Sequence, residues 1–216
     1  MTTALVLSGG GARAAYQVGV LKAVAELLPR RTHNPFPIVC GTSAGAINAL
    51  AVAGRPGFLR QRVSKLENIW GTLRAENVYR TDLPGVIRNT SCLIWSLFHS
   101  GYSKHRALAL LDNSPLRELL KQLVRFRYID EAIARGELTA VSATAMDYGT
   151  GRSVTFFQGR HDTWERSRRL GIRCGLTIDH LLASSAIPTI FPATSIDDSY
   201  YGDGAVRQLK PLSPAL

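Results

Sequence analysis

The sequence predicts an α/β protein with a mainly parallel central sheet. Two short apolar runs, residues 4–8 (ALVLS) and 38–40 (IVC), each lead into a glycine-containing loop and then into a helical pattern. Short continuous apolar runs are typical of strands that are buried on both faces, as in parallel sheets. The repeated order of strand, loop and helix therefore indicates the α/β class.

The two helices that follow these loops differ in composition. After the first loop, apolar residues from Val18 to Leu28 recur at helical spacing until Pro29 ends the pattern. The helix after the second loop is rich in alanine and ends near Gly54. Because alanine side chains are small, neighbouring elements can approach the backbone of this helix closely. We therefore expect it to lie in the middle of the domain.

The remaining elements are predicted less sharply. Residues 56–134 read as helices and loops in which we identify no site. Beyond them, turn residues at 148–151 separate two strand-like runs, and glycine tolerates the positive φ that such turns need. The expected elements, in chain order, are a helix near residues 116–123, strands at 138–147 and 153–158, a helix from 177 to 186 and a strand at 199–201.

Length and cysteine usage limit the classes of protein to consider. A chain of 216 residues fits one domain with a continuous core. Cys40, Cys92 and Cys174 are odd in number and widely spaced, without a metal-site pattern, so we expect a reducing setting, no metal and no other cofactor. The first residues lack the regions of a signal peptide, and the most apolar run, 92–98, is too short to span a bilayer. We expect a cytoplasmic protein that can contact a membrane peripherally.

The formal net charge of +10 favours anionic partners such as nucleic acid or acidic lipid surfaces. The basic residues are dispersed and lack the aromatic interleaving or zinc spacing of nucleic-acid modules, so no nucleic-acid partner is expected. Residues 92–98, beside Arg88, Lys104 and Arg106, either pack in the core or dock on an anionic membrane.

A candidate nucleophile lies between the second strand and its helix. Gly41-x-Ser43-x-Gly45 has the pattern of a nucleophile elbow, a tight turn that presents a serine hydroxyl. The bare pattern is weak, because chance would produce it in roughly one such chain in ten. Its position after an apolar strand and before a helix strengthens the prediction. A plain helix cap at Ser43 is the structural alternative.

A serine hydroxyl needs a base, because it is a poor nucleophile at its ordinary pKa. In the α/β-hydrolase order a histidine would come last, but no histidine follows the loop Gly202-Asp203-Gly204. A triad could instead combine an earlier acid with His161 or His180, although neither lies in a glycine-flanked context. Asp203 could also be a turn residue that binds its own backbone.

The first loop, Gly9-Gly10-Gly11-Ala12-Arg13, offers backbone N–H groups without side-chain obstruction just before a helix N-terminus. Such a loop can bind an oxyanion or a phosphate, or form only a tight turn. Its glycines satisfy a relaxed dinucleotide-binding fingerprint. However, residues 32–41 contain no acidic residue that could bind a ribose, which argues against a nucleotide.

Taken together, these motifs resemble those of the patatin-like phospholipase family. SGGGARAAYQVGVLKAV is similar to its glycine-rich loop, GTSAGA to its elbow, GDGA to its catalytic aspartate loop, and ASSAIPTIFP to the segment before that aspartate. The resemblance implies a three-layer α/β/α fold and a Ser43–Asp203 dyad without histidine. It also implies an oxyanion hole from Gly9, Gly10, Gly11 and Arg13, and an aspartate loop formed by Gly202, Gly204 and Ala205.

The function that this resemblance implies is that of a serine lipid acyl hydrolase of the phospholipase A, lysophospholipase or carboxylesterase type. Its substrate would be a phospholipid or another acyl-ester lipid, cleaved through an acyl-enzyme. Arg13 would brace the glycine loop or stabilise charge directly. Alternatives are a phosphate- or nucleotide-binding module and an inactive lipid-binding relative.

The chain departs from the family's pattern in two respects. Ala14 stands where many members have glycine, and we expect the family's C-terminal region to lie outside these 216 residues. Ser213 before Pro214 has the pattern of a helix start. We therefore expect residues 1–216 to form a single catalytic domain that lacks its C-terminal part.

Overall fold

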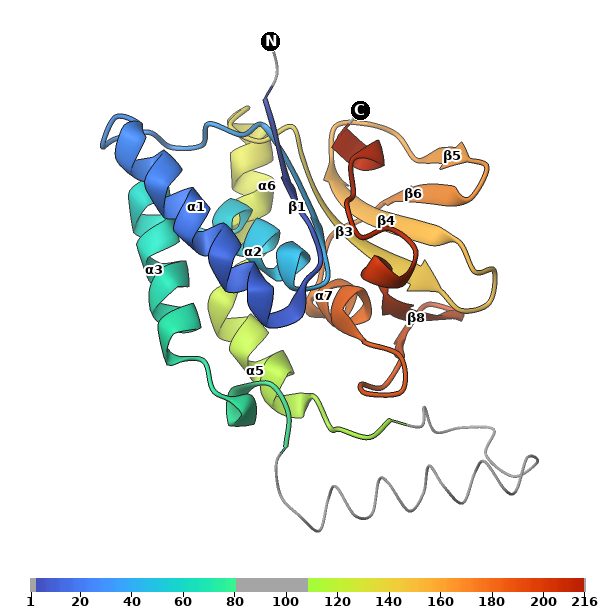
Figure 1. The fold of residues 1–216 in the computed structure, drawn as a ribbon. Helices are drawn as coiled ribbons and strands as arrows, with labels where there is room; N and C mark the ends of the chain where they lie inside the picture. The colour runs from blue at the N-terminus through green and yellow to red at the C-terminus, as the bar shows by residue number, and fades with distance from the viewer. Residues whose placement is uncertain (1–2, 81–108, 216) are drawn as a thin grey trace, which may run out of the picture.

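A mixed sheet forms the centre of the protein in the computed structural model, which describes residues 3–80 and 109–215 (Figure 1). Its strands are β1 (Ala4–Leu7), β2 (Ile38–Thr42), β3 (Ala140–Asp147), β4 (Ser153–Gly159), β5 (Trp164–Arg166), β6 (Arg169–Arg173), β7 (Thr194–Ile196) and β8 (Ser199–Asp203). Within the described part they follow the order β1-β2-β3-β4-β6-β5, while β8 pairs with β3 and β7 with β8.

The pairing directions explain how the chain enters and leaves the sheet. β1, β2 and β3 run parallel, as do β4 and β6. The β3–β4, β3–β8, β5–β6 and β7–β8 pairs are antiparallel. The five strands predicted from the sequence are confirmed, with ends shifted by one or two residues, whereas β5, β6 and β7 were not predicted.

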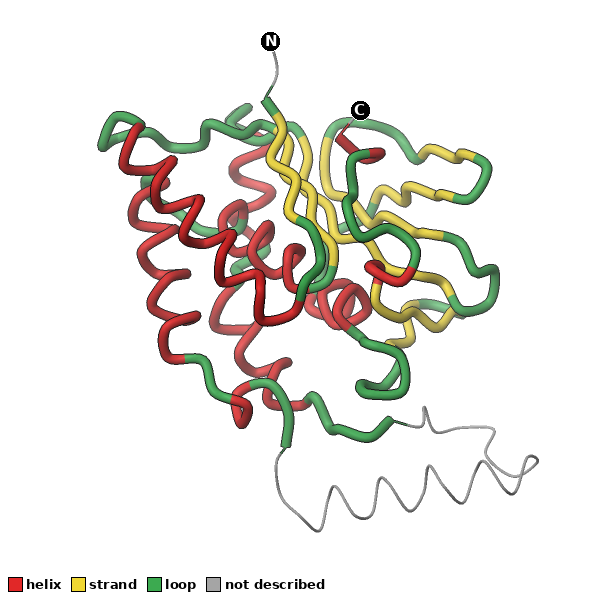
Figure 2. The backbone as a smooth tube through the Cα atoms, viewed as in Figure 1, coloured by secondary structure: helices red, strands yellow, loops and turns green. Residues whose placement is uncertain are grey.

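The long helices lie together on one side of the sheet in Figure 2. They are α1 (Ala14–Leu27), α2 (Ala44–Ala53), α3 (Leu59–Thr72), α5 (Ser114–Leu123), α6 (Arg127–Ala134) and α7 (Ile178–Ser185). α2 and α7 pack directly on the sheet, and α1 and α3 pack on each other outside α2. None of the helices in the described part is long and apolar enough to cross a membrane.

The alanine-rich helix α2 lies in the middle of the protein, as predicted. Nine of its ten residues are buried, and only Ile47 is partly exposed. It contacts β1, β2 and β3 on one side and α1, α3 and α7 on others. This central position fixes the start of α2, and with it the candidate elbow.

The opposite face of the sheet carries a cavity of about 540 Å³. Ile38, Cys40 and Ser142 line it, whereas their neighbours in β2 and β3, such as Val39, belong to the hydrophobic core beneath the helices. Neither this cavity nor a groove of about 650 Å³ along α3 is lined by the candidate catalytic residues. The apolar run 92–98 and its basic neighbours lie outside the described residues.

Candidate active site

Two strands meet end to end along one edge of β3 and bring the candidate residues together. β2 pairs with β3 up to Thr42 opposite Thr144, and β8 continues along the same edge with Asp203 opposite Ala145. The other edge of β3 is occupied by β4. Because β2 and β8 run towards each other, Ser43 and Asp203 come from opposite directions to one point.

Ser43 occupies a strained turn between β2 and α2. Its φ of 54° and ψ of −132° lie in a region that residues with a side chain rarely adopt. Such strain costs on the order of 1–3 kcal/mol and is characteristic of functional sites. The carbonyl of Ser43 accepts the N–H groups of Ala46 and Ile47 at 2.8 and 3.3 Å, so α2 begins immediately after the turn.

Both glycines of the elbow are required by close backbone contacts. A Cβ atom on Gly41 would lie 2.4 Å from Cα of Ala46, and one on Gly45 would lie 2.4 Å from the carbonyl oxygen of Leu7. Real Cβ atoms do not approach other atoms so closely. The G-x-S-x-G spacing therefore reflects the packing of α2 against the ends of β1 and β2.

The side chains of Ser43 and Asp203 form a direct hydrogen bond. Oγ of Ser43 donates to Oδ2 of Asp203 at 2.6 Å, and the two residues are only 5% and 4% exposed. Oδ1 of Asp203 accepts the N–H of Ala205 at 2.8 Å. Burial raises the pKa of Asp203, while the hydrogen bonds from Ser43 and Ala205 lower it, and burial dominates. Asp203 is therefore more basic than an exposed aspartate.

The loop around Asp203 leaves no room for side chains on its glycines. A Cβ atom on Gly204 would lie 2.1 Å from the carbonyl oxygen of Thr144, and one on Gly202 would lie 2.6 Å from the hydroxyl oxygen of Tyr148. Gly204, Ala205 and Val206 then form a 3-10 turn (η3). These contacts hold the aspartate loop tightly against β3.

The glycine loop follows β1 and faces the same point. A Cβ atom on Gly9 would lie 3.3 Å from Cβ of Ser43 and 2.8 Å from Cβ of Ala205. The N–H of Gly9 donates to the carbonyl of Leu209 at 3.1 Å. Within the described residues, the N–H groups of Gly10 and Gly11 make no hydrogen bond. Gly10 and Gly11 thus retain free donors, while that of Gly9 is occupied.

Arg13 lies at the end of the glycine loop as the N-cap of α1. Its backbone N–H donates to the carbonyl of Gly10 at 3.1 Å, and its side chain is exposed. The guanidinium makes no hydrogen bond or ion pair with any residue in 3–80 or 109–215. The expectation that it braces the loop through its side chain therefore finds no contact here.

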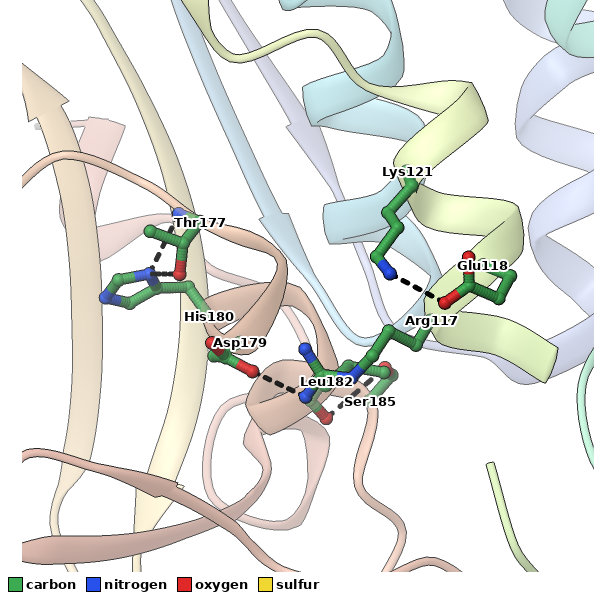
Figure 3. Close-up of polar contacts among 8 residues, drawn as sticks. All are labelled: Arg117, Glu118, Lys121, Thr177, Asp179, His180, Leu182 and Ser185. Carbon is green, nitrogen blue, oxygen red and sulfur yellow. Dashed lines mark hydrogen bonds and ion pairs between the residues drawn. The ribbon is translucent and has the colours of Figure 1, made fainter. Parts of the chain in front are cut away.

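The histidines considered for a triad lie elsewhere. His180 Nδ1 accepts the N–H of Thr177 at 3.0 Å at the start of α7, and Figure 3 shows its ring turned towards Thr177. Because Nδ1 is the acceptor, the neutral ring carries its proton on Nε2, which lies 3.6 Å from the sulfur of Cys174. His161 lines the cavity on the opposite face of the sheet.

Sequence reasoning missed one residue that contacts the nucleophile. Oγ of Ser184, in α7, accepts the backbone N–H of Ser43 at 2.9 Å. The only sequence signal was its place in the run ASSAIP before Asp203, which gives no role to a particular serine. Two residues later, the carbonyl of Ala186 accepts the N–H of Asp203 at 2.8 Å.

Comparison with known proteins identifies the family. The family model for patatin-like phospholipase matches residues 5–216. The chain belongs to the patatin-like phospholipase family. The patatin-like α/β fold predicted from the glycine loop, the elbow and the aspartate loop is thereby confirmed.

Several curated proteins are similar to this patatin-like chain at low identity. It is 27% identical over 203 residues to a cGAMP-activated phospholipase of Pseudomonas aeruginosa, covering 94% of this chain and 52% of that protein. It is 26% identical over 216 residues to a cGAMP-activated phospholipase of Escherichia coli, with 96% and 52% covered. A calcium-independent phospholipase A2-gamma of Rattus norvegicus is 24% identical over 212 residues, with 98% and 25% covered. The chain thus spans about half the length of the two bacterial relatives.

Proposed function

We propose that this patatin-like chain is a serine lipid acyl hydrolase that uses a Ser43–Asp203 dyad. The observation that carries the proposal is the 2.6 Å hydrogen bond between the two side chains, with the serine on a strained elbow. An activated nucleophile needs a base within hydrogen-bond reach, and Asp203 meets this requirement directly. The raised pKa of Asp203 supports its role as a base.

The reaction proceeds in two steps. Oδ2 of Asp203 accepts the hydroxyl proton of Ser43 as Oγ forms a bond to the ester carbonyl carbon. The bond to the alcohol oxygen then breaks, and the leaving alcohol takes the proton from Asp203. In the second step Asp203 deprotonates a water molecule that attacks the acyl-enzyme, and Oγ of Ser43 leaves and regains its proton as the fatty acid is released.

The glycine loop supplies the stabilisation of negative charge in this mechanism. The free N–H groups of Gly10 and Gly11 are the candidate donors to the developing oxyanion, and they lie just before the positive end of the α1 dipole. Removing one oxyanion donor typically costs about 100- to 1000-fold in turnover. The exposed guanidinium of Arg13 adds positive charge near this loop.

The surroundings of the dyad support a lipid substrate. Three apolar residues beside the dyad are exposed: Ile187 by 37%, Val206 by 55% and Leu209 by 51%. Each is next to the site backbone: Ile187 follows the carbonyl that binds Asp203, Val206 ends the turn after it, and Leu209 bonds to Gly9. Exposed apolar groups at a site mark a surface that binds apolar partners. The relatives are named phospholipases, which supports the same substrate class.

Labelling with a fluorophosphonate tests the proposal, because such probes react only with activated serines. We expect labelling at Ser43, release of fatty acid from phospholipid vesicles, and loss of both in Ser43→Ala, on the order of a million-fold in turnover. The assay should be run with and without cGAMP, because the two bacterial relatives are named for activation by it. If Ser43→Ala retains a tenth of wild-type hydrolysis, the serine assignment is wrong.

Contact with an anionic membrane is a second part of the proposal. The net charge of +10 supports attraction to a negatively charged lipid surface. Flotation with vesicles that contain or lack anionic lipid tests it. Greater flotation with the anionic vesicles is expected, and no flotation with either type would contradict it.

A further inference from the structure

We propose that Ser184 is a positioning residue that holds the nucleophile elbow in its reactive conformation. The proposal rests on the proposed function, because it assumes that Ser43 is the nucleophile. Ser184 does not contact the reacting atoms. It acts through the backbone of Ser43, to which it is bonded across 141 residues of sequence.

The hydroxyl of Ser184 joins three elements by two bonds that are compatible with each other. Oγ accepts the N–H of Ser43 at 2.9 Å and donates its own proton to the carbonyl of Thr144 at 2.6 Å. Ser184 is fully buried, so no water competes for either bond. The end of β2, the middle of β3 and α7 are therefore connected through one oxygen atom.

The bond to Ser184 fixes the part of Ser43 that is strained. The N–H direction of a residue is set by its φ, and φ of Ser43 is 54°. The carbonyl on the other side of Ser43 is held by the first turn of α2. With both peptide groups held, the serine side chain keeps one direction, towards Asp203. Without the Ser184 hydroxyl, the buried N–H of Ser43 would lose its partner, which favours relaxation of the turn.

The same end of α7 also holds the base. The carbonyl of Ala186, two residues after Ser184, accepts the N–H of Asp203 at 2.8 Å. One short segment, residues 184–186, thus accepts hydrogen bonds from the backbones of both the nucleophile and the base. Ser184 sets the nucleophile side of this arrangement.

Replacement of Ser184 by alanine tests the proposal. The rate constant for fluorophosphonate labelling and kcat for a short-chain ester should be measured well below the melting temperature of the variant. We expect Ser184→Ala to lower both about 10- to 100-fold, because a small misplacement of a reacting group costs this much. KM should change less than twofold, because Ser184 does not reach the substrate surface.

Ser185 provides a matched control in the next position of the same helix. It is also buried, and its hydroxyl donates to the carbonyl of Leu181 at 2.7 Å. The same hydroxyl lies 3.5 Å from the carbonyl oxygen of Leu182, the contact drawn in Figure 3. Its hydroxyl makes no hydrogen bond with Ser43. Ser185→Ala should therefore label within twofold of wild type, even if its stability falls as much as that of Ser184→Ala.

Three results would overturn the proposal. The first is labelling of Ser184→Ala within twofold of wild type, and the second is a loss of activity in Ser185→Ala as large as that in Ser184→Ala. If Ser184→Ala does not fold, Ser184→Cys keeps the shape with a weaker hydrogen bond, and normal labelling of that variant would equally contradict the role. If the wild-type protein is itself not labelled, the proposed function fails, and this inference fails with it. If the wild-type protein is labelled and Ser184→Ala is labelled equally well, only this inference fails.

Discussion

Oγ of Ser43 and Oδ2 of Asp203 lie 2.6 Å apart although 160 residues separate them in the chain. The sheet produces this contact, because β2 and β8 end at adjacent positions of β3. The carboxylate contacts the hydroxyl directly, without an intervening imidazole. Any chemistry at Ser43 therefore depends on the protonation state of one aspartate.

Asp203→Asn should nearly abolish hydrolysis. An amide cannot accept the serine proton, and it would donate a hydrogen bond to Oγ in place of accepting one. Loss of the acid of a serine-based catalytic group costs on the order of 10⁴-fold in kcat. Ester hydrolysis under saturating substrate measures it. Retention of more than a hundredth of the wild-type rate would contradict the role of Asp203 as base.

The stability of Asp203→Asn should move in the opposite direction from its activity. Burial raises the pKa of Asp203 in the folded state, so its stabilising contribution is present at low pH and is lost as pH rises through that pKa. At pH 7 the buried charge therefore costs stability, and a neutral amide removes that cost. Thermal melting at pH 7 should place the variant at or above wild type, with the difference shrinking towards pH 4. A lower melting temperature at pH 7 would mean that the charge stabilises the fold.

The pH dependence of activity should report the same group. The base is active only as a carboxylate, so kcat/KM rises with pH through the pKa of Asp203. Because burial raises this pKa, the midpoint should lie above the value of about 3.9 for an unperturbed aspartate. A pH series with a substrate that does not titrate measures it. A midpoint at or below that value would indicate that Asp203 does not act as the base.

The sequence predicted the elements that carry the site because their patterns are local. The apolar run before Gly9 and the one before Gly41 indicated β1 and β2, and the alanine content of residues 44–53 indicated a central helix. The edge strand β5 and its neighbour β6 were missed, since the arginines Arg166, Arg169 and Arg173 hide the strand pattern. Strands at the edge of a sheet carry such charges because they are partly exposed.

Other features could not be predicted because they depend on contacts between distant segments. The bond between Ser43 and Ser184 requires α7 to lie beside the turn after β2. The N–H of Gly9 is similarly occupied by Leu209, near the other end of the chain. The glycine loop was recognisable as a set of donors, but which of its donors remain free is a property of the fold.

Protonation of His180 should destabilise the start of α7. Burial lowers the pKa of His180, although Asp179 and Asp197 oppose this shift. The contribution of His180 to folding stability is therefore present above its unfolded-state pKa, near 6.5, and is lost as pH falls through its lower folded-state pKa. Protonated Nδ1 cannot accept the N–H of Thr177. The urea midpoint should therefore fall between pH 7.5 and pH 5, with about 1 kcal/mol lost, which is typical of a helix cap.

The variant His180→Gln separates this effect from other titrating groups. Glutamine can accept the N–H of Thr177 in a capping box but does not titrate. Its urea midpoint should decline less than that of wild type over the same pH range. Equal declines in the two proteins would show that His180 does not cause the loss.

Two glycines at helical positions should respond in opposite ways to alanine. A Cβ atom on Gly45 would lie 2.4 and 2.5 Å from the carbonyl oxygens of Leu7 and Ser8, so α2 must move away from β1. We expect Gly45→Ala to lose on the order of 4 kcal/mol of unfolding free energy, or not to fold. A Cβ atom on Gly19, in α1, would meet no described atom within 4 Å, so Gly19→Ala should gain about 0.5–1 kcal/mol. Urea unfolding of both variants measures this. If Gly45→Ala were as stable as Gly19→Ala, the close approach of α2 to β1, on which the elbow geometry depends, would be wrong.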